Sequence, residues 1–272
     1  MRRVAFQGER GAYSEAAAIA HVGEIDSLPC RTVAEVFDAV ERREADLGMV
    51  PVENSQAGSI NDTYDLLVRR SLNIVGERNL RIEHCLLALP EERLDTIRTV
   101  SSHPQALAQC DAFLARHGWE VVPAYDTAGS AKIVAAERRA GVAAIDSRHA
   151  AEIYGLRILA RGIETSPVNY TKFLALALAP APPTEQAKTS LVFTTANVPG
   201  ALYRALGAFA ERGINLTKLE SRPRRDRPWE YLFYVDFEMH QDSAEGRAAL
   251  ADLAGATAFL RILGSYPKAH EG

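Results

Sequence analysis

The chain has 272 residues, a formal net charge of -4 and 47% hydrophobic residues. This composition is typical of a globular protein and excludes extensive disorder. The small negative charge gives no electrostatic reason to expect binding to nucleic acid or to an anionic membrane. No apolar run approaches the roughly 20 residues of a membrane-spanning helix. The first residues become charged again too early for a secretory signal, so a cytoplasmic location is expected.

Cysteine, histidine and glycine spacing gives no sign of a metal or cofactor site. Cys30, Cys85 and Cys110 are odd in number and scattered, which predicts reduced, packed thiols. The seven histidines show no HxxxH or HxH spacing, so no metal is expected. The chain has no GxxxxGKS/T motif and no GxGxxG after its first strand. No nucleotide cofactor is therefore expected.

The first two thirds of the chain predict strands that alternate with helices. Strands are predicted at 2–8, 46–54, 96–102, 119–126 and 142–146. The helices that follow them are predicted at 14–22, 59–70, 103–118, 127–141 and 147–155. Such alternation predicts an α/β fold with a largely parallel sheet that helices cover on both faces.

The last third of the chain has a different order of elements. The proline-rich segment 179–190 predicts a stiff, extended linker. After it we predict a strand at 188–196, a helix at 199–213, strands at 214–223 and 229–239, a helix at 242–256 and a strand at 257–267, with a basic turn at 224–227 between the middle strands. The order β-α-β-β-α-β is that of the ferredoxin-like fold.

Small polar residues join several predicted strands to the helices that follow. These joints are at 53–55, 101–105, 126–131 and 146–149. The first amides of a helix lack internal partners and lie at the positive end of the helix dipole, so they suit carboxylates or phosphates. Several joints together predict a ligand with more than one carboxylate. The alternative is that each joint is an ordinary helix cap.

The stretch SPVNYTKFLAL (166–176) places four polar side chains ahead of an apolar run. If 168–177 is a strand, Asn169, Thr171 and Phe173 share one face, and Tyr170 and Lys172 share the other. An amide and a hydroxyl at an apolar wall would form a hydrogen-bonding pair in a dry setting, where such groups are stronger. The alternative is a satisfied Asn and Thr at the start of a strand.

Several motifs, in order along the chain, resemble those of the prephenate dehydratases. They are VAFQGERGAYSE (4–15), GMVPVENSQAGSI (48–60), SSHPQALAQC (101–110), YDTAGSA (125–131) and NYTKF (169–173). GALY (200–203) and ESRP (220–223) resemble the phenylalanine-binding motifs of the family's C-terminal ACT regulatory domain. The resemblance covers nearly the whole chain.

This resemblance implies a fold and a division into domains. The catalytic domain would cover 1–178 and resemble type II periplasmic binding proteins, with two α/β lobes and the active site between them. Residues 1–80 with 160–178 would form one lobe, and 80–160 the other. A ferredoxin-like ACT domain would cover 188–267.

The resemblance also implies a reaction. The family converts prephenate to phenylpyruvate, water and carbon dioxide, as a step in phenylalanine biosynthesis, and assigns the hydrogen donor to a threonine that falls on Thr171. Glu53 and Asp126 are expected to orient their neighbours. The substrate-binding residues that the family implies here are Asn54, Ser55, Ser102, Gln109, Thr127, Ala128, Gly129, Ser130, Asn169 and Phe173.

For the ACT domain, the resemblance implies L-phenylalanine as an allosteric effector that binds between chains, so a homodimer or homotetramer is expected. The implied effector-binding residues are Gly200, Ala201, Leu202, Asn215, Leu216, Glu220, Ser221, Arg222 and Pro223.

One residue departs from the family pattern, because Lys172 stands where the family usually has arginine. Lysine cannot form arginine's planar, bidentate contacts, and we expect Lys172 to brace the site through a charge pair behind the catalytic face. Three alternatives stay open: an arogenate dehydratase, a prephenate decarboxylase that retains the hydroxyl, and a non-catalytic amino-acid sensor.

Overall fold

The computed structural model describes residues 1–224, 227 and 229–269. The chain forms two compact units: unit 1 is Met1–Thr63 with Arg78–Phe173, and unit 2 is Tyr64–Glu77 with Leu174–Gly272. Within the described residues, no helix is both long enough and apolar enough to cross a membrane.

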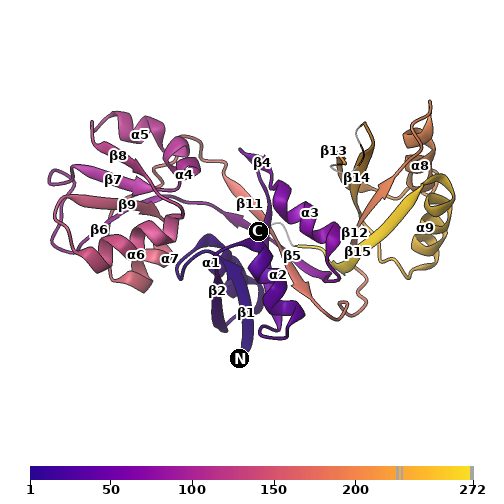
Figure 1. The fold of residues 1–272 in the computed structure, drawn as a ribbon, viewed down its shortest axis with the longest axis horizontal. Helices are drawn as coiled ribbons and strands as arrows, with labels where there is room; N and C mark the ends of the chain where they lie inside the picture. The colour runs from indigo at the N-terminus through magenta and orange to yellow at the C-terminus, as the bar shows by residue number, and fades with distance from the viewer. Residues whose placement is uncertain (225–226, 228, 270–272) are drawn as a thin grey trace. The chain divides into compact units, whose positions relative to one another are not determined.

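The first lobe of unit 1 is built on a mixed sheet, to which unit 2 also contributes residues 73–77 and 174–177 (Figure 1). Its strand order is β2-β1-β3-β11-β5, with the short β4 beside β3. The strands are β1 (Arg2–Gln7), β2 (Ile25–Cys30), β3 (Leu47–Asn54), β4 (Gly58–Ser59), β5 (Asn73–Arg81) and β11 (Tyr170–Ala177). β1 runs parallel to both β2 and β3. Its helices are α1 (Tyr13–Val22) and α2 (Val33–Glu41), whereas α3 (Asn61–Arg69) lies mostly in unit 2.

The spacing of apolar residues explains how α2 packs. Val33, Val36, Phe37 and Val40 are buried, at positions that share one face of a helix. Thr32 caps the helix, because its side chain accepts a hydrogen bond from the backbone N–H of Glu35. The cap begins the helix at the point that brings the apolar face against the sheet.

The second lobe of unit 1 has its own five-stranded sheet, in the order β10-β6-β9-β7-β8. Its strands are β6 (Cys85–Ala88), β7 (Thr99–Ser102), β8 (Glu120–Pro123), β9 (Val142–Asp146) and β10 (Arg157–Arg161), and its helices are α4 (Pro104–Gln109), α5 (Asp111–Ala115), α6 (Thr127–Glu137) and α7 (Arg148–Tyr154). Leu86 and Ala88 pack in the same cluster as residues of α4 and α5. Cys85 and Leu87, on the other face of β6, pack with residues of α6 and α7.

Helices therefore cover both faces of this sheet, as the strand and helix alternation predicts. The prediction of a largely parallel sheet is wrong for this lobe, because β6 runs antiparallel to both β9 and β10. The predicted helix at 103–118 is also two helices. They are separated at Cys110, whose backbone leaves the helical region at φ -109° and ψ 15°.

Unit 2 contains the predicted β-α-β-β-α-β order. Its elements are β12 (Ala187–Thr194), α8 (Ala201–Ala210), β13 (Leu216–Pro223), β14 (Tyr231–Phe237), α9 (Ala244–Ala256) and β15 (Phe259–Pro267). The strand order β13-β14-β12-β15 is that of a ferredoxin-like sheet, and both helices lie on one side of it (Figure 1). Arg225 and Asp226 of the predicted basic turn lie outside the described residues.

The segment Tyr64–Glu77 belongs to unit 2 although it is distant in sequence from the other strands. The rings of Tyr64 and Tyr234 meet edge to face at 4.9 Å. Arg222 pairs with Asp65 at 3.1 Å. At the end of the segment, the buried Glu77 carboxylate accepts two hydrogen bonds from Lys188, at 2.6 and 2.9 Å. Ring packing and ion pairs thus fix this segment to the sheet of unit 2.

Gly264 in β15 provides a test of how closely unit 2 is packed. A Cβ at this position would lie 2.2 Å from the carbonyl oxygen of Ile74, and a Cβ has no rotation that could relieve this contact. We expect Gly264→Ala to lower the free energy of unfolding by about 2 kcal/mol or more, measured by urea denaturation. The control is Gly255→Ala in α9, where nothing lies within 4 Å, and alanine should be neutral or stabilising. Equal midpoints for Gly264→Ala and the wild type would contradict this packing.

Candidate active site

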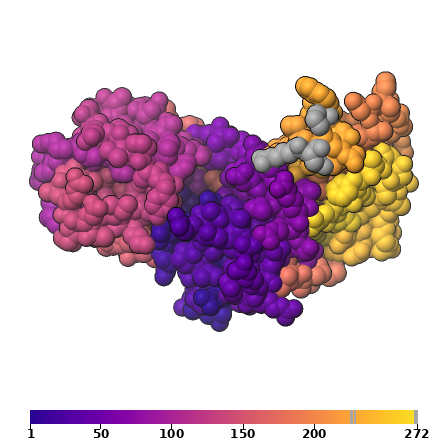
Figure 2. Space-filling view, in the orientation of Figure 1, coloured from indigo at the N-terminus to yellow at the C-terminus, as the bar shows by residue number. Residues whose placement is uncertain are grey.

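A cavity of about 340 Å³ lies between the two lobes of unit 1 and takes its lining residues from both. Figure 2 shows the two lobes in contact, with the N-terminal residues in indigo and the second lobe in magenta to pink. The size is in the range of small-molecule sites. We call it the interlobe cavity.

The side chain of Asn54, at the end of β3, fixes the orientation of the Thr171 hydroxyl. Asn54 Oδ1 accepts hydrogen bonds from the backbone N–H groups of Gln56 (3.1 Å) and Ala57 (3.0 Å). Its Nδ2 must therefore point the other way, where it donates to Thr171 Oγ1 at 3.0 Å. Because Asn54 occupies one acceptor position of that oxygen, the hydroxyl hydrogen of Thr171 is left to donate elsewhere. Thr171 lines the interlobe cavity.

A chain of hydrogen bonds extends this arrangement away from Thr171. Asn54 Nδ2 also donates to Asn169 Oδ1 (2.9 Å), and Asn169 Nδ2 donates to Gln109 Oε1 (3.1 Å). His84 Nε2 lies 2.9 Å from the same Gln109 oxygen, and His84 Nδ1 lies 3.0 Å from the Tyr13 hydroxyl. Five hydrogen-bond contacts thus connect six side chains from Tyr13 to Thr171. We call this chain the amide relay.

The relay is consistent only with one tautomer of His84. The Gln109 oxygen can only accept, so Nε2 carries the hydrogen. In the neutral ring Nδ1 is then an acceptor, and it shares the single hydrogen of the Tyr13 hydroxyl with the Glu83 carbonyl, 2.9 Å from that hydroxyl. Burial lowers the pKa of His84, with smaller opposing effects from Gln109 and Glu164. The neutral imidazole is therefore the favoured form.

One polar atom of the relay has no partner among the residues that the structure describes. Gln109 Nε2 is buried and makes no hydrogen bond, although Gln109 lines the interlobe cavity. A buried donor without an acceptor costs about 1–3 kcal/mol. A ligand oxygen in the cavity would satisfy it.

Two helices begin at the interlobe cavity without side-chain caps. The residue before α1 is Ala12, and the residue before α6 is Asp126, whose side chain makes no capping hydrogen bond. The first-turn amides of both helices are positions where carboxylates bind. Arg31 also lines the cavity. The cavity therefore offers two helix starts and one guanidinium to an acidic ligand.

The structure brings the predicted catalytic residue, Thr171, and only some of the predicted substrate-binding residues to the cavity. Those that line it are Asn54, Gln109, Thr127, Thr171 and Phe173. Asn169 is fully buried behind them, in the amide relay. Tyr13, His84 and Arg31 were not predicted. They come from separate parts of the chain, and only Tyr13 falls within one of the matched motifs, VAFQGERGAYSE.

The remaining predicted residues have other contacts. The Ser102 hydroxyl donates to the carbonyl of Ile145 at 2.7 Å, between β7 and β9. The Ser55 hydroxyl accepts from the backbone N–H of Tyr170 at 3.0 Å. Ala128, Gly129 and Ser130 are buried in the first turn of α6, and the Ser130 hydroxyl donates to the Asp126 carbonyl at 3.0 Å. These side chains position the backbone of the site.

Lys172, on the face of β11 opposite Thr171, does not have the contacts that we predicted. Lys172 is partly exposed, and Thr171 and Phe173 on either side of it are buried, so the predicted strand alternation is confirmed. With the residues that the structure describes, however, Lys172 makes no ion pair. The predicted bracing charge pair is therefore not seen.

The predicted effector residues fall at two ends of the four-stranded sheet of unit 2. β12 and β13 both run antiparallel to β14, so they point the same way. Gly200, Ala201 and Leu202 follow β12 and line a second cavity, of about 360 Å³, within unit 2. Glu220, Ser221, Arg222 and Pro223 end β13 at the same end, whereas Asn215 and Leu216 lie at its other end.

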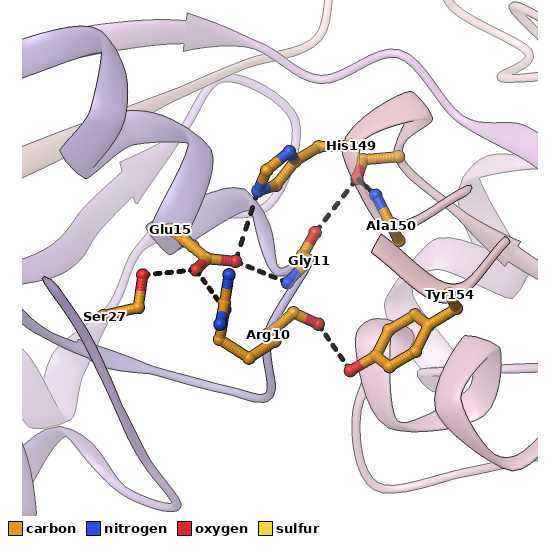
Figure 3. Close-up of polar contacts among 8 residues, drawn as sticks. Arg10, Gly11, Glu15, Ser27, His149, Ala150 and Tyr154 are labelled. Atoms are coloured by element: carbon orange, nitrogen blue, oxygen red, sulfur yellow. Dashed lines mark hydrogen bonds and ion pairs between the residues drawn. The ribbon is translucent and has the colours of Figure 1, made fainter. Parts of the chain in front are cut away.

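A buried carboxylate holds the two lobes of unit 1 together beside the start of α1 (Figure 3). Glu15 is fully buried and accepts from Gly11 N (2.6 Å), Ser27 Oγ (2.5 Å), Arg10 Nε (2.6 Å) and, from the second lobe, His149 Nε2 (3.2 Å). Beside Glu15, Ser147 Oγ donates to Gly11 O (3.0 Å) and Tyr154 OH donates to Arg10 O (2.7 Å), and both bonds cross between the lobes.

Burial alone would raise the pKa of Glu15. The hydrogen bonds from His149, Gly11 and Ser27, with the charge of Arg10, outweigh burial and lower that pKa from 4.5 to about 2. A carboxylate whose pKa is lower in the folded than in the unfolded state stabilises the fold at any pH above its unfolded-state pKa. This stabilisation is lost as the pH falls through the folded-state pKa.

We therefore expect Glu15→Gln to be destabilised by about 3 kcal/mol at neutral pH, with the difference from wild type shrinking between about pH 4.5 and pH 2. Urea denaturation across this pH range measures it. The control is Glu152→Gln, at an exposed surface pair with Arg148, where the difference should stay below about 1 kcal/mol. A difference for Glu15→Gln that does not change with pH would show that its ionisation does not stabilise the fold.

Comparison with known proteins agrees with this architecture. The prephenate dehydratase family model matches residues 4–181, and the ACT domain model matches residues 189–255. The chain is 46% identical to arogenate dehydratase/prephenate dehydratase 2, chloroplastic, of Arabidopsis thaliana, over 97% of this chain and 72% of that protein. It is also 46% identical to arogenate dehydratase 1 of Petunia hybrida, over 97% of this chain and 66% of that protein.

Two solved structures are similar over almost the whole chain. GqqA, described as a novel type of quorum quenching acylase, has a TM-score of 0.91 and 39% identity, with 98% of each chain covered. The prephenate dehydratase of Arthrobacter aurescens in complex with L-Phe has a TM-score of 0.88 and 33% identity, with 98% of this chain and 90% of that chain covered. The chain belongs to the prephenate dehydratase family of lyases and carries a C-terminal ACT domain.

Proposed function

We propose that the chain removes carbon dioxide and the ring hydroxyl from prephenate to yield phenylpyruvate, or does the same to its amino analogue arogenate to yield phenylalanine. Electrons of the bond to the departing carboxylate enter the ring, the carbon–oxygen bond breaks, and the ring becomes aromatic. Hydroxide is a poor leaving group, so the departing oxygen needs a hydrogen-bond donor and leaves as water after it takes up a proton.

The observation that carries this proposal is the hydrogen bond from Asn54 to Thr171 Oγ1. It leaves the Thr171 hydrogen free at the wall of the interlobe cavity. Phe173, on the same face of β11, also lines the cavity and is 2% exposed. A hydrogen bond beside an apolar wall is stronger than one in water. The donor is therefore placed where it can stabilise charge that develops on the leaving oxygen.

The two carboxylates of the substrate would bind where the cavity already favours anions. The starts of α1 and α6 and the side chain of Arg31 all border it. The unpartnered Gln109 Nε2 supplies a further donor toward the substrate. With both ends of the substrate held, the ring hydroxyl can be kept at Thr171 throughout the reaction.

The likeness to GqqA supports acylase activity as a second candidate. Hydrolysis of an acyl group needs an activated nucleophile or water. Cys30 lines the cavity, but burial and the charges of Glu35 and Glu44 raise the pKa of its thiol to about 11. Both ring nitrogens of His84 already have partners. Cys30 is therefore a poor nucleophile and His84 has no free nitrogen to activate water, which favours the dehydratase over the acylase.

For the ACT domain, the proposed effector is L-phenylalanine, with feedback on catalysis. One chain places Gly200 and Pro223 near one end of the sheet and Asn215 near the other. A second chain, related by a two-fold axis, could bring its Asn215 to the Gly200 end. This arrangement supports an effector site shared between chains in a homodimer or homotetramer.

The role of Thr171 can be tested with purified protein, prephenate or arogenate, and no added cofactor, by following phenylpyruvate or phenylalanine. We expect Thr171→Val to lower kcat at least about 100-fold, because the hydroxyl donor is lost. Thr171→Ser keeps a hydroxyl and should retain kcat to within about tenfold of wild type. Equal rates for wild type and Thr171→Val would remove Thr171 from this role. No product from either substrate with the wild type would end the dehydratase proposal.

The amide relay predicts an effect of His84, which does not contact Thr171. His84→Leu removes the donor to Gln109 Oε1, so we expect kcat to fall about tenfold as the amides lose their fixed orientation. His84→Gln can replace that donor and should restore most of kcat. In the wild type, kcat should decline only below the usual histidine pKa of about 6.5, because burial lowers this pKa. Equal kcat values for His84→Leu and the wild type would show that the relay does not position Thr171.

A further inference from the structure

The two carboxylates at the interlobe cavity differ in how far their charge is already balanced. Glu9 accepts hydrogen bonds from Lys132 Nζ (2.9 Å) and from the Tyr125 hydroxyl (3.2 Å), so a cation already neutralises it. Asp126 accepts from the backbone N–H of Glu9 at 3.1 Å. Among the described residues it has no cation as an ion-pair partner. The cavity therefore contains one uncompensated carboxylate.

The position of Asp126 gives this charge a specific neighbourhood. Asp126 immediately precedes α6, but its carboxylate makes no capping hydrogen bond to that helix and instead accepts from the backbone N–H of Glu9. Its Oδ2 also lies close to the loop that leads into α1, because a Cβ at Gly8 would be 3.4 Å from this oxygen. Asp126 and Thr127, the first residue of α6, therefore both border the cavity, and no side chain caps the start of that helix.

This pairing matches an α-amino acid group, in which an ammonium and a carboxylate are attached to one carbon. The helix amides would bind the carboxylate, and Asp126 would bind the ammonium through a charge-assisted hydrogen bond. A keto acid would place a carbonyl oxygen against the Asp126 carboxylate, where two acceptors face each other without a hydrogen between them. Such a mismatch selects against the keto form.

We infer that Asp126 determines substrate specificity, binding the ammonium group of the amino form of the substrate and so favouring arogenate over prephenate. This inference rests on the proposed dehydratase function. The product is then phenylalanine itself. Amino transfer to the keto side chain must accordingly precede the formation of the aromatic ring.

The test is kcat/KM for arogenate and for prephenate, measured with the wild type, with Asp126→Asn and with the control Asp111→Asn, which alters a carboxylate on α5 outside the cavity. For the wild type we expect kcat/KM for arogenate to exceed kcat/KM for prephenate more than tenfold. Asp126→Asn should lower this ratio at least tenfold, chiefly through a higher KM for arogenate, because asparagine attracts the ammonium less and repels the keto form less. Asp111→Asn should leave the ratio unchanged.

The outcomes separate this inference from the function on which it rests. A wild type that prefers prephenate overturns the inference even if Asp126→Asn does not fold. A ratio that is the same in Asp126→Asn and the wild type, with both substrates converted, overturns it while the dehydratase function stands. Equal losses for both substrates would assign Asp126 a structural role only. Conversion of neither substrate by the wild type overturns the proposed function and the inference together.

Discussion

The hydrogen bond from Asn54 to Thr171 is the constraint on which the rest of the site depends. A threonine hydroxyl can rotate, and a hydroxyl that donates to its own protein is useless to a leaving group. Two backbone amides hold the Asn54 oxygen, so its nitrogen must face Thr171. The oxygen of Thr171 becomes an acceptor within the protein, and its hydrogen is available to the cavity. The chemistry therefore depends on backbone geometry after β3 as much as on Thr171.

The surrounding contacts maintain that geometry. Through the amide relay, the orientation of Asn54 is linked by hydrogen bonds to His84 before β6 and to Tyr13 at the start of α1. Glu15 joins the two lobes beside the start of α1, so the helix amides and Thr171 belong to one cavity (Figure 3). Fixed dipoles and donors of this kind need no reorganisation when charge develops on the substrate. Asp126, which we infer selects the amino form of the substrate, lines the same cavity and accepts a hydrogen bond from Glu9 in the loop before α1.

Sequence patterns predicted the parts of this structure that depend on local periodicity. The burial of Asn169, Thr171 and Phe173 follows from strand alternation, and the ferredoxin-like order follows from strand and helix patterns. β2, with a proline and two polar residues, and the short β6 lack such a signal. The break at Cys110 and the relay through His84 depend on contacts between distant segments, which no local pattern records. The roles assigned to Ser102 and Ser130 matched motifs, but their hydroxyls are bonded to backbone carbonyls.

The most direct measurement of the central claim is a crystal structure of the wild type with an unreactive substrate analogue that keeps the ring hydroxyl. The account predicts that this hydroxyl oxygen lies about 2.6–3.2 Å from Thr171 Oγ1, with Asn54 Nδ2 still donating to the same threonine oxygen. An analogue bound in the interlobe cavity with its ring hydroxyl beyond hydrogen-bonding distance of Thr171, or bound outside this cavity, would contradict the account.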